Sequence, residues 1–286
     1  MSLQDKLSKY YPNFPRANDI TLEQMLHHTS GIYNYTSAPS FAVDGMIHRS
    51  TDEMVEYIGK LPKTQDFEPG TDWSYSNSAY FILGSVVEKA AGETLAKVFK
   101  TRLFTPLGMT HTALDDETEI VAGRAAGYSA SAPGKFTNAP FISMSIPGGA
   151  GSIRSTAGDL AKWNAALYGG KILKAASLAA MLTPGKLNNG ENSGTAMAKM
   201  MAAAGAPAAT QSAKHEYGYA LFLSEVEGHR KIDHGGGIYG FSAALSEFPD
   251  DKTTVVVLSN AIGKDVGASK IADRIERLAI GLPAKK

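Results

Sequence analysis

Four extended segments near the C-terminus, joined by very short connections, constrain this fold most. They cover Tyr217–Val226, Arg230–His234, Phe241–Phe248 and Thr253–Ser259. The connections are Gly-rich stretches or a Pro-Asp-Asp-Lys turn, too short for the helical crossover that parallel strands need. The segments therefore predict neighbouring strands of one antiparallel sheet.

Helix signals dominate the sequence before these strands. Thr21 is a predicted N-cap, Ser50 and Glu53 form a predicted capping box, and Asn77 is the expected N-cap of a helix over 78–91. Apolar residues recur at helical spacing after each cap. A further helix is predicted over 158–168. The segment 188–214 lacks a clear period, so we expect a mobile excursion there, with one helical stretch over Met197–Ala203.

A C-terminal amphipathic helix follows the strands. Its apolar stripe predicts that five side chains face the sheet, namely Ile271, Ala272, Ile275, Leu278 and Ala279. Together these patterns predict an α+β fold in one unit over 1–286. Residues 1–215 would form a mainly helical region, and 216–286 would supply the antiparallel strands and the last helix.

Composition excludes several function classes. Lys plus Arg and Asp plus Glu each number 28, so no excess charge points to nucleic acid. Cysteine is absent, which excludes disulfides and thiolate chemistry. The longest apolar runs are far too short to span a membrane, and the polar start of the chain has no signal-peptide pattern. The chain as written is expected to be cytoplasmic, although a longer parent could be periplasmic or secreted.

Five stretches in order carry a resemblance to a known family. They are Ile20–Ile32, Trp73–Asn77, Arg102–Thr112, Gly148–Trp163 and Asp233–Phe241. Their order and spacing resemble the serine β-lactamase and penicillin-binding-protein group, which includes class C β-lactamases, D,D-peptidases and family VIII carboxylesterases. The resemblance implies a β-lactamase/transpeptidase-like fold, with an antiparallel sheet flanked by helices.

Members of this group use three active-site elements: Ser-x-x-Lys, Tyr-x-Asn, and either Lys-Thr-Gly or His-Gly-Gly. The resemblance implies that Tyr75 and His234 are catalytic. A Tyr hydroxyl has a pKa of about 10 and becomes a base only where nearby cations lower it. The expected substrate-binding residues are Ser76, Asn77, Gly235, Gly236 and Ser152. Two of these, Ser76 and Ser152, are also weaker candidates for a nucleophile.

The Ser-x-x-Lys element does not occur, since no Lys has a Ser three positions before it. In the family this helix lies upstream of the segment that Met1–Leu7 resembles. The resemblance thus implies that the nucleophile helix and the N-terminal strands are missing. Their absence would expose apolar surface, through which the chain could form a homo-oligomer.

The function expected from these residues is hydrolysis of small activated esters in a pocket without the usual serine. Histidine in place of the family's lysine weakens the case for a β-lactam carboxylate and favours an ester. Two alternatives stay open. The chain could be a catalytically silent scaffold that binds peptide or cell-wall-like ligands, or a metal-assisted hydrolase that uses the vacated cavity.

No cofactor and no dedicated metal site are expected, and the expected partner is a small-molecule ester. The histidines lack the short spacing of a metal site on one element. The run His27–Gly31 is interpreted as the structural end of a helix.

Overall fold

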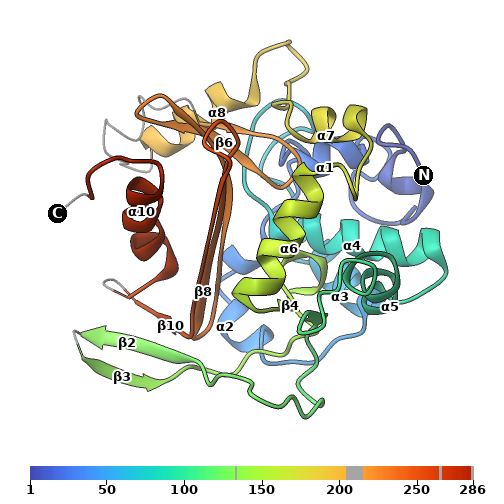
Figure 1. Cartoon of the computed structure of the whole chain (residues 1–286). Coiled ribbons are helices and arrows are strands. Elements are labelled where there is room, and N and C mark those ends of the chain that lie inside the picture. The colour runs from blue at the N-terminus through green and yellow to red at the C-terminus, as the bar shows by residue number, and fades with distance from the viewer. Residues whose placement is uncertain (133, 204–214, 264–265, 285–286) are drawn as a thin grey trace.

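The protein forms three layers, seen edge-on in Figure 1. The computed structural model describes residues 1–132, 134–203, 215–263 and 266–284. Helix α10 (Ala268–Ala279) covers one face of a five-stranded sheet, and the helical region lies on the other side of the sheet. This arrangement confirms the predicted α+β fold.

The sheet is antiparallel throughout, as the short connections predict. Its order is β5-β6-β7-β8-β9, with bounds Glu216–Tyr217, Phe222–Val226, His229–Ile238, Phe241–Phe248 and Thr253–Ser259. One boundary was predicted wrongly. Gly235–Gly237 form no turn but continue β7, where they pair with residues 242–244 of β8. The chain reverses instead at Gly240, whose φ of 81° belongs to the left-handed region that glycine adopts most easily.

The edge of β7 is only partly covered. Strand β6 pairs with β7 no further than Asp233, which lies opposite Phe222. From His234 to Ile238, β7 pairs with β8 on one side. Among the described residues, no strand lies along its other side. This part of β7 therefore offers an open strand edge.

The helical region contains eight α-helices in its described part. Their bounds are α1 Leu22–Leu26, α2 Phe41–Asp44, α3 Thr51–Gly59, α4 Asn77–Ala91, α5 Leu95–Phe99, α6 Ala157–Tyr168, α7 Ala175–Met181 and α8 Ser193–Ala203. The predicted N-cap Thr21 of α1 and the predicted capping box of α3 both form, and Thr21 also makes a capping box with Gln24. Helix α8 contains the helical stretch predicted within the excursion over 188–214, of which 204–214 fall outside the described residues. No helix in the described ranges is long and apolar enough to cross a bilayer.

Short strands also occur within 1–215, and the sequence did not predict them. Strand β1 (Ala113–Leu114) pairs with β4 (Ile153–Arg154). Strands β2 (Tyr128–Ala132) and β3 (Lys135–Asn138) form a hairpin, beside which β10 (Ala261–Ile262) runs parallel to β2. Most are two residues long or largely exposed, so they carry no alternating burial pattern that a sequence could reveal.

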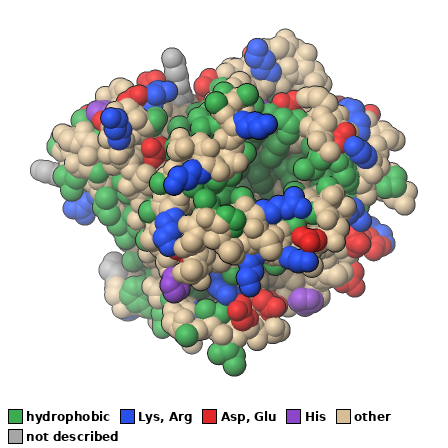
Figure 2. All heavy atoms as spheres, turned by 45° about the vertical axis from the view of Figure 1, so that its right-hand side comes forward, with side chains coloured by type: hydrophobic (Ala, Val, Ile, Leu, Met, Phe, Trp, Pro, Cys, Tyr) green, Lys and Arg blue, Asp and Glu red, His purple; other side chains and the backbone are tan. Residues whose placement is uncertain are grey.

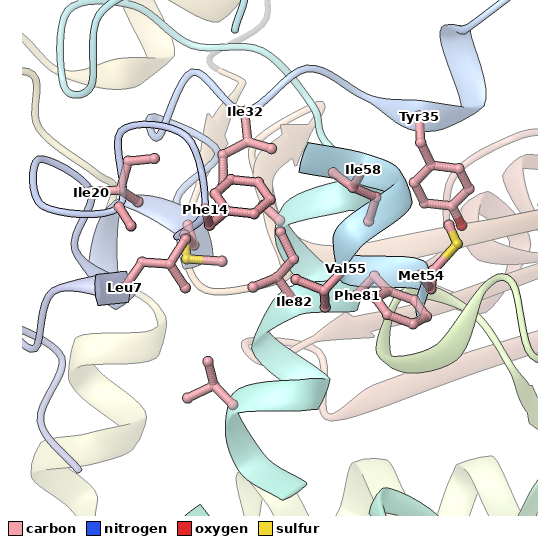
Figure 3. Close-up of a cluster of buried hydrophobic side chains, with 14 of the residues drawn as sticks. Leu7, Phe14, Ile20, Ile32, Tyr35, Met54, Val55, Ile58, Phe81 and Ile82 are labelled. Carbon is pink, nitrogen blue, oxygen red and sulfur yellow. The ribbon is translucent and has the colours of Figure 1, made fainter. Parts of the chain in front are cut away.

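The main apolar core lies where α3 and α4 meet the N-terminal segment (Figure 3). Met54 and Ile58 of α3 pack with Ile82 of α4, and all three are at most 1% exposed. Burying each such side chain stabilises the fold by about 1.5–3 kcal/mol. This core holds α4 in place and thereby fixes the segment that enters it.

The helical region also has an apolar surface that is not filled by other side chains. It is a hollow of about 480 Å³ between the N-terminal segment, α1, α4 and α5. Its lining includes Leu3, Leu26, Leu83, Val87 and Phe99. Hydrophobic side chains gather around a hollow on the face that Figure 2 brings forward.

Helix α10 faces the sheet with the side opposite to the predicted one. Ile271, Ile275 and Leu278 are 46%, 44% and 63% exposed, whereas Ala272 and Glu276 are buried. Small alanines let the helix approach β8 and β9 closely. The Glu276 carboxylate lies between the sheet and the helix, where it accepts hydrogen bonds from the Ser246 hydroxyl at 2.5 Å and the Lys231 ammonium at 2.7 Å. Only Ala272 of the named stripe lies on the buried face.

Replacing Glu276 should therefore destabilise the protein more than removing an apolar side chain from the same helix. Glu276→Ala leaves the Lys231 ammonium, whose side chain is 17% exposed, without its closest carboxylate. We expect a loss of about 3 kcal/mol in the free energy of unfolding. The control Leu278→Ala should change it by less than about 1 kcal/mol. Urea denaturation followed by circular dichroism measures both, and a larger loss in Leu278→Ala would contradict this orientation of α10.

Candidate active site

An aromatic cluster surrounds one buried histidine where the helical region meets the sheet. The His28 ring is 1% exposed. Its centroid lies 4.4 Å from the Tyr75 ring, 4.8 Å from Tyr217, 5.0 Å from Tyr80 and 5.9 Å from Trp73. The cluster thus joins the end of α1, the segment that leads into α4, and the first strand of the sheet.

The backbone after α1 turns sharply to place this ring. His28 has a φ of 59°, a left-handed conformation that is uncommon for a non-glycine residue. Gly31 follows with a φ of 74°, and a Cβ there would lie 2.1 Å from the Phe67 carbonyl oxygen. The Ser74 amide donates to the His28 carbonyl at 3.0 Å. These contacts fix the histidine against the Trp73–Asn77 segment.

Hydrogen bonds define the protonation of His28. The Ser76 amide lies 3.1 Å from Nδ1, and the Tyr217 hydroxyl lies 3.1 Å from Nε2. A backbone N–H only donates, so Nδ1 is the acceptor and Nε2–H donates to Tyr217. Burial lowers the pKa of His28 well below its ordinary value. The imidazole is therefore neutral.

His234 lies on β7, at the first residue of the open edge. Its Nδ1 is 2.6 Å from the Gly235 carbonyl oxygen and its Nε2 is 3.4 Å from the Tyr217 hydroxyl. Its ring centroid is 6.1 Å from that of Tyr75 and 5.4 Å from that of Phe222. Burial lowers its pKa below the ordinary value of 6.5. A neutral imidazole whose Nδ1–H donates to Gly235 keeps Nε2 as a proton acceptor.

Burial shifts the pKa of Tyr75 in the opposite direction to that of His234. Its side chain is half-buried, and desolvation raises the pKa of its phenol above 10. The phenol therefore keeps its proton at neutral pH and acts as a hydrogen-bond donor rather than as a base. The pair thus combines a proton acceptor, His234, with a hydrogen-bond donor, Tyr75.

The remaining motif residues lie on the same two segments as this pair. Gly235 and Gly236 are exposed on the open edge of β7, directly after His234. Asn77 is half-buried at the first position of α4, and its side-chain amide donates to the Thr36 hydroxyl at 3.3 Å. The structure thus brings Tyr75 and His234 together beside a glycine-lined strand edge.

Two predicted serines do not fit a role in the pocket. Ser76, rather than Asn77, is the N-cap of α4, because its hydroxyl accepts from the Ala79 amide at 3.2 Å. The Ser152 hydroxyl donates to the Met144 carbonyl at 2.7 Å. Both serines are 1% exposed. Because both hydroxyls are buried and each already makes a hydrogen bond, the geometry gives no support to the prediction that they bind substrate or act as a nucleophile.

Sequence reasoning missed His28 and Tyr217. The interpretation of His27–Gly31 as a helix end describes the backbone correctly but overlooks the His28 ring. The four consecutive polar residues 27–30 are all buried in the structure, which their polarity in the sequence does not indicate. Buried polar groups need partners. The partner of His28 is 189 positions away, where no local pattern indicates it.

A metal centre receives no support from the described part of the chain. Within it, no group of three His, Cys, Asp or Glu side chains is arranged to hold a metal ion. The metal-assisted alternative therefore has no candidate ligand set among these residues.

An antiparallel sheet between one helix layer and a helical region, with Tyr-x-Asn at the start of α4 and His-Gly-Gly at the sheet edge, is typical of the β-lactamase/transpeptidase-like class. The Beta-lactamase family model matches residues 1–279, and the chain belongs to this family. The resemblance seen in the sequence is thereby confirmed.

Relatives of known sequence include a penicillin-binding protein of Bacillus subtilis (strain 168), 26% identical over 99% of this chain. A teichoic acid D-alanine hydrolase of Staphylococcus aureus is 28% identical over 57% of it. The chain covers 60% of the former protein and the match covers 38% of the latter, so these relatives are considerably longer.

Solved structures of the same fold include a D-stereospecific amidohydrolase from Streptomyces sp. Its identity is 25% and its TM-score 0.72, over 91% of this chain and 75% of that one. The octameric penicillin-binding protein homologue from Pyrococcus abyssi has 23% identity and a TM-score of 0.77, over 99% of this chain and 61% of that one. Both support the α+β architecture described above.

If Ser76 serves as a helix cap, its removal should reduce stability. Ser76→Ala leaves the Ala79 amide without its acceptor, and we expect a loss of about 1 kcal/mol in the free energy of unfolding. Ser74→Ala is the matched control, since this serine of the same segment caps no helix. Thermal unfolding followed by circular dichroism compares the two. Equal stability of both variants would contradict the cap assignment.

Proposed function

We propose that this chain hydrolyses small activated esters in the pocket formed by Tyr75, His234 and the open edge of β7. One observation carries the proposal: a neutral imidazole and a protonated phenol lie with ring centroids 6.1 Å apart beside the same strand edge. Relatives named as hydrolases of D-alanine and amide groups support acyl chemistry at such a site.

The geometry suits attack by water on the ester carbonyl. The water oxygen bonds to the carbonyl carbon while its proton passes to Nε2 of His234. The Tyr75 hydroxyl donates a hydrogen bond to the carbonyl oxygen as negative charge develops there. The tetrahedral intermediate then breaks its bond to the alcohol oxygen, which takes the proton back from His234. The activated leaving group matters, because no enzyme nucleophile assists the first step.

The glycine-lined edge supplies the room for this reaction. Gly235 and Gly236 carry no side chain, so the acyl group can lie against the backbone of β7. The contact between the Tyr217 hydroxyl and Nε2 of His234 is long at 3.4 Å, so this hydrogen bond is weak and leaves Nε2 able to accept a proton from a reacting water.

The open edge of β7 also favours a second function, the binding of peptide or cell-wall-like ligands without turnover. An extended peptide can add to an unpaired strand edge through main-chain hydrogen bonds. In that case Tyr75 and His234 would contact the ligand and transfer no proton. Replacing them would weaken binding, and the wild type would show no turnover.

The ester proposal predicts that both side chains matter for turnover. Tyr75→Phe and His234→Ala should each lower the rate on short-chain p-nitrophenyl esters about ten-fold or more. Tyr219→Phe is the matched control, since the Tyr219 hydroxyl donates to Glu23, which lies outside the pocket. Turnover above an identically purified blank, unchanged by a chelator, is the expected wild-type result. Unchanged rates in both pocket variants would contradict the assignment of Tyr75 and His234 as catalytic residues.

The same proposal predicts a bell-shaped pH profile. Burial lowers the pKa of His234, so its base form persists down through pH 6.5 and the rate falls only at lower pH. Burial raises the pKa of Tyr75, so the donor is lost only above about pH 10. Tyr75→Phe should keep the acid limb and lose the alkaline one. A profile that declines from pH 8 downward would contradict the role of His234.

A further inference from the structure

Four hydrogen bonds run in series through the candidate site. The Ser76 amide donates to Nδ1 of His28 at 3.1 Å, and Nε2 of His28 donates to the Tyr217 oxygen at 3.1 Å. The Tyr217 hydroxyl lies 3.4 Å from Nε2 of His234, and Nδ1 of His234 lies 2.6 Å from the Gly235 carbonyl oxygen. The chain therefore begins and ends on the backbone.

The two backbone ends fix the direction of every bond between them. The Ser76 amide can only donate, and the Gly235 carbonyl can only accept. With both imidazoles neutral, a single placement of protons satisfies all four contacts. In that placement the Tyr217 proton points to Nε2 of His234, and His234 carries its own proton on Nδ1.

We propose that His28 and Tyr217 are positioning residues that hold His234 in the Nδ1–H tautomer, with Nε2 ready to accept a proton. The inference rests on the proposed function, in which His234 is the base. Neither His28 nor Tyr217 needs to touch the substrate, since both are 1% exposed. They act through the ring of His234.

Burial makes this arrangement firm. Water cannot replace a lost partner at His28 or Tyr217. Removing one of the two side chains therefore leaves a buried polar group of the other without a hydrogen bond. Burial also raises the pKa of Tyr217 above its ordinary value, so its hydroxyl keeps the proton that it donates. The titratable side chains near these rings are His27, Tyr75, Tyr80 and Asp233.

The same hydroxyl can serve His234 after proton transfer. A protonated His234 has N–H groups on both ring nitrogens, so its Nε2 must then donate. The Tyr217 oxygen has a second lone pair beside the one that His28 uses, and it can accept this new bond. Tyr217 is thus suited to both protonation states of His234, and a phenylalanine at this position is suited to neither.

The tautomer of His234 can be observed without any turnover. Two-bond ¹H–¹⁵N spectra of the full chain labelled at histidine, recorded at neutral pH, distinguish Nδ1–H from Nε2–H. His234→Gln assigns the signal. We expect the Nδ1–H form in the wild type and a mixture of both forms in Tyr217→Phe. Tyr219→Phe, a tyrosine two positions along the chain, should match the wild type. His28→Gln keeps a donor amide and should preserve the tautomer better than His28→Leu.

Kinetics on p-nitrophenyl acetate give the second readout. Tyr217→Phe should lower kcat about ten-fold and leave KM nearly unchanged, because its side chain does not contact the ester. A wild type in the Nε2–H form, or a Tyr217→Phe variant with an unchanged tautomer, would overturn the inference whatever the rates. The expected tautomers together with no turnover in the wild type would instead support the positioning and reject the ester hydrolase.

Discussion

The hydrogen bond between the His28 imidazole and the Tyr217 hydroxyl joins two parts of the chain that are 189 residues apart. One partner follows α1 in the helical region, and the other begins the sheet. Both are almost fully buried among aromatic rings, so neither has water as a substitute partner. The positions of Tyr75 on one side and His234 on the other depend on this contact, because each packs against one of its members.

Much of the fold could be predicted from the sequence because its determinants are local. Capping boxes before α1 and α3 and the β-branched strands of the sheet each act over a few residues. The wrong predictions concern segments whose local sequence pattern is compatible with two structures. Glycines fit a turn or an open strand, and Gly235–Gly237 form a strand. An amphipathic stripe does not reveal which side of the helix packs against the sheet. Helix α10 turns Glu276 towards the sheet because the Glu276 carboxylate forms hydrogen bonds there with Lys231 and Ser246.

The candidate site was predictable to the extent that its motifs are contiguous. Tyr75 and His234 stand in recognisable sequence contexts, and the structure places them beside each other. Ser76 was assigned to the pocket because a motif does not reveal which way a hydroxyl points, and here it caps α4. His28 and Tyr217 were not predicted because their role depends on the hydrogen bond between them, which joins residues far apart in the sequence. No property of either segment alone contains that information.

The long separation of this pairing also bears on how the protein reaches its native state. Closing a loop of this length costs chain entropy before the contact returns any energy, so such contacts tend to slow folding. Helices such as α3 and α4 can form from nearby residues, whereas the aromatic cluster requires the sheet to be docked. We therefore expect the pocket to be among the last parts of the molecule to become native, so that chains arrested on the ribosome before β5 emerges contain helices but no assembled site.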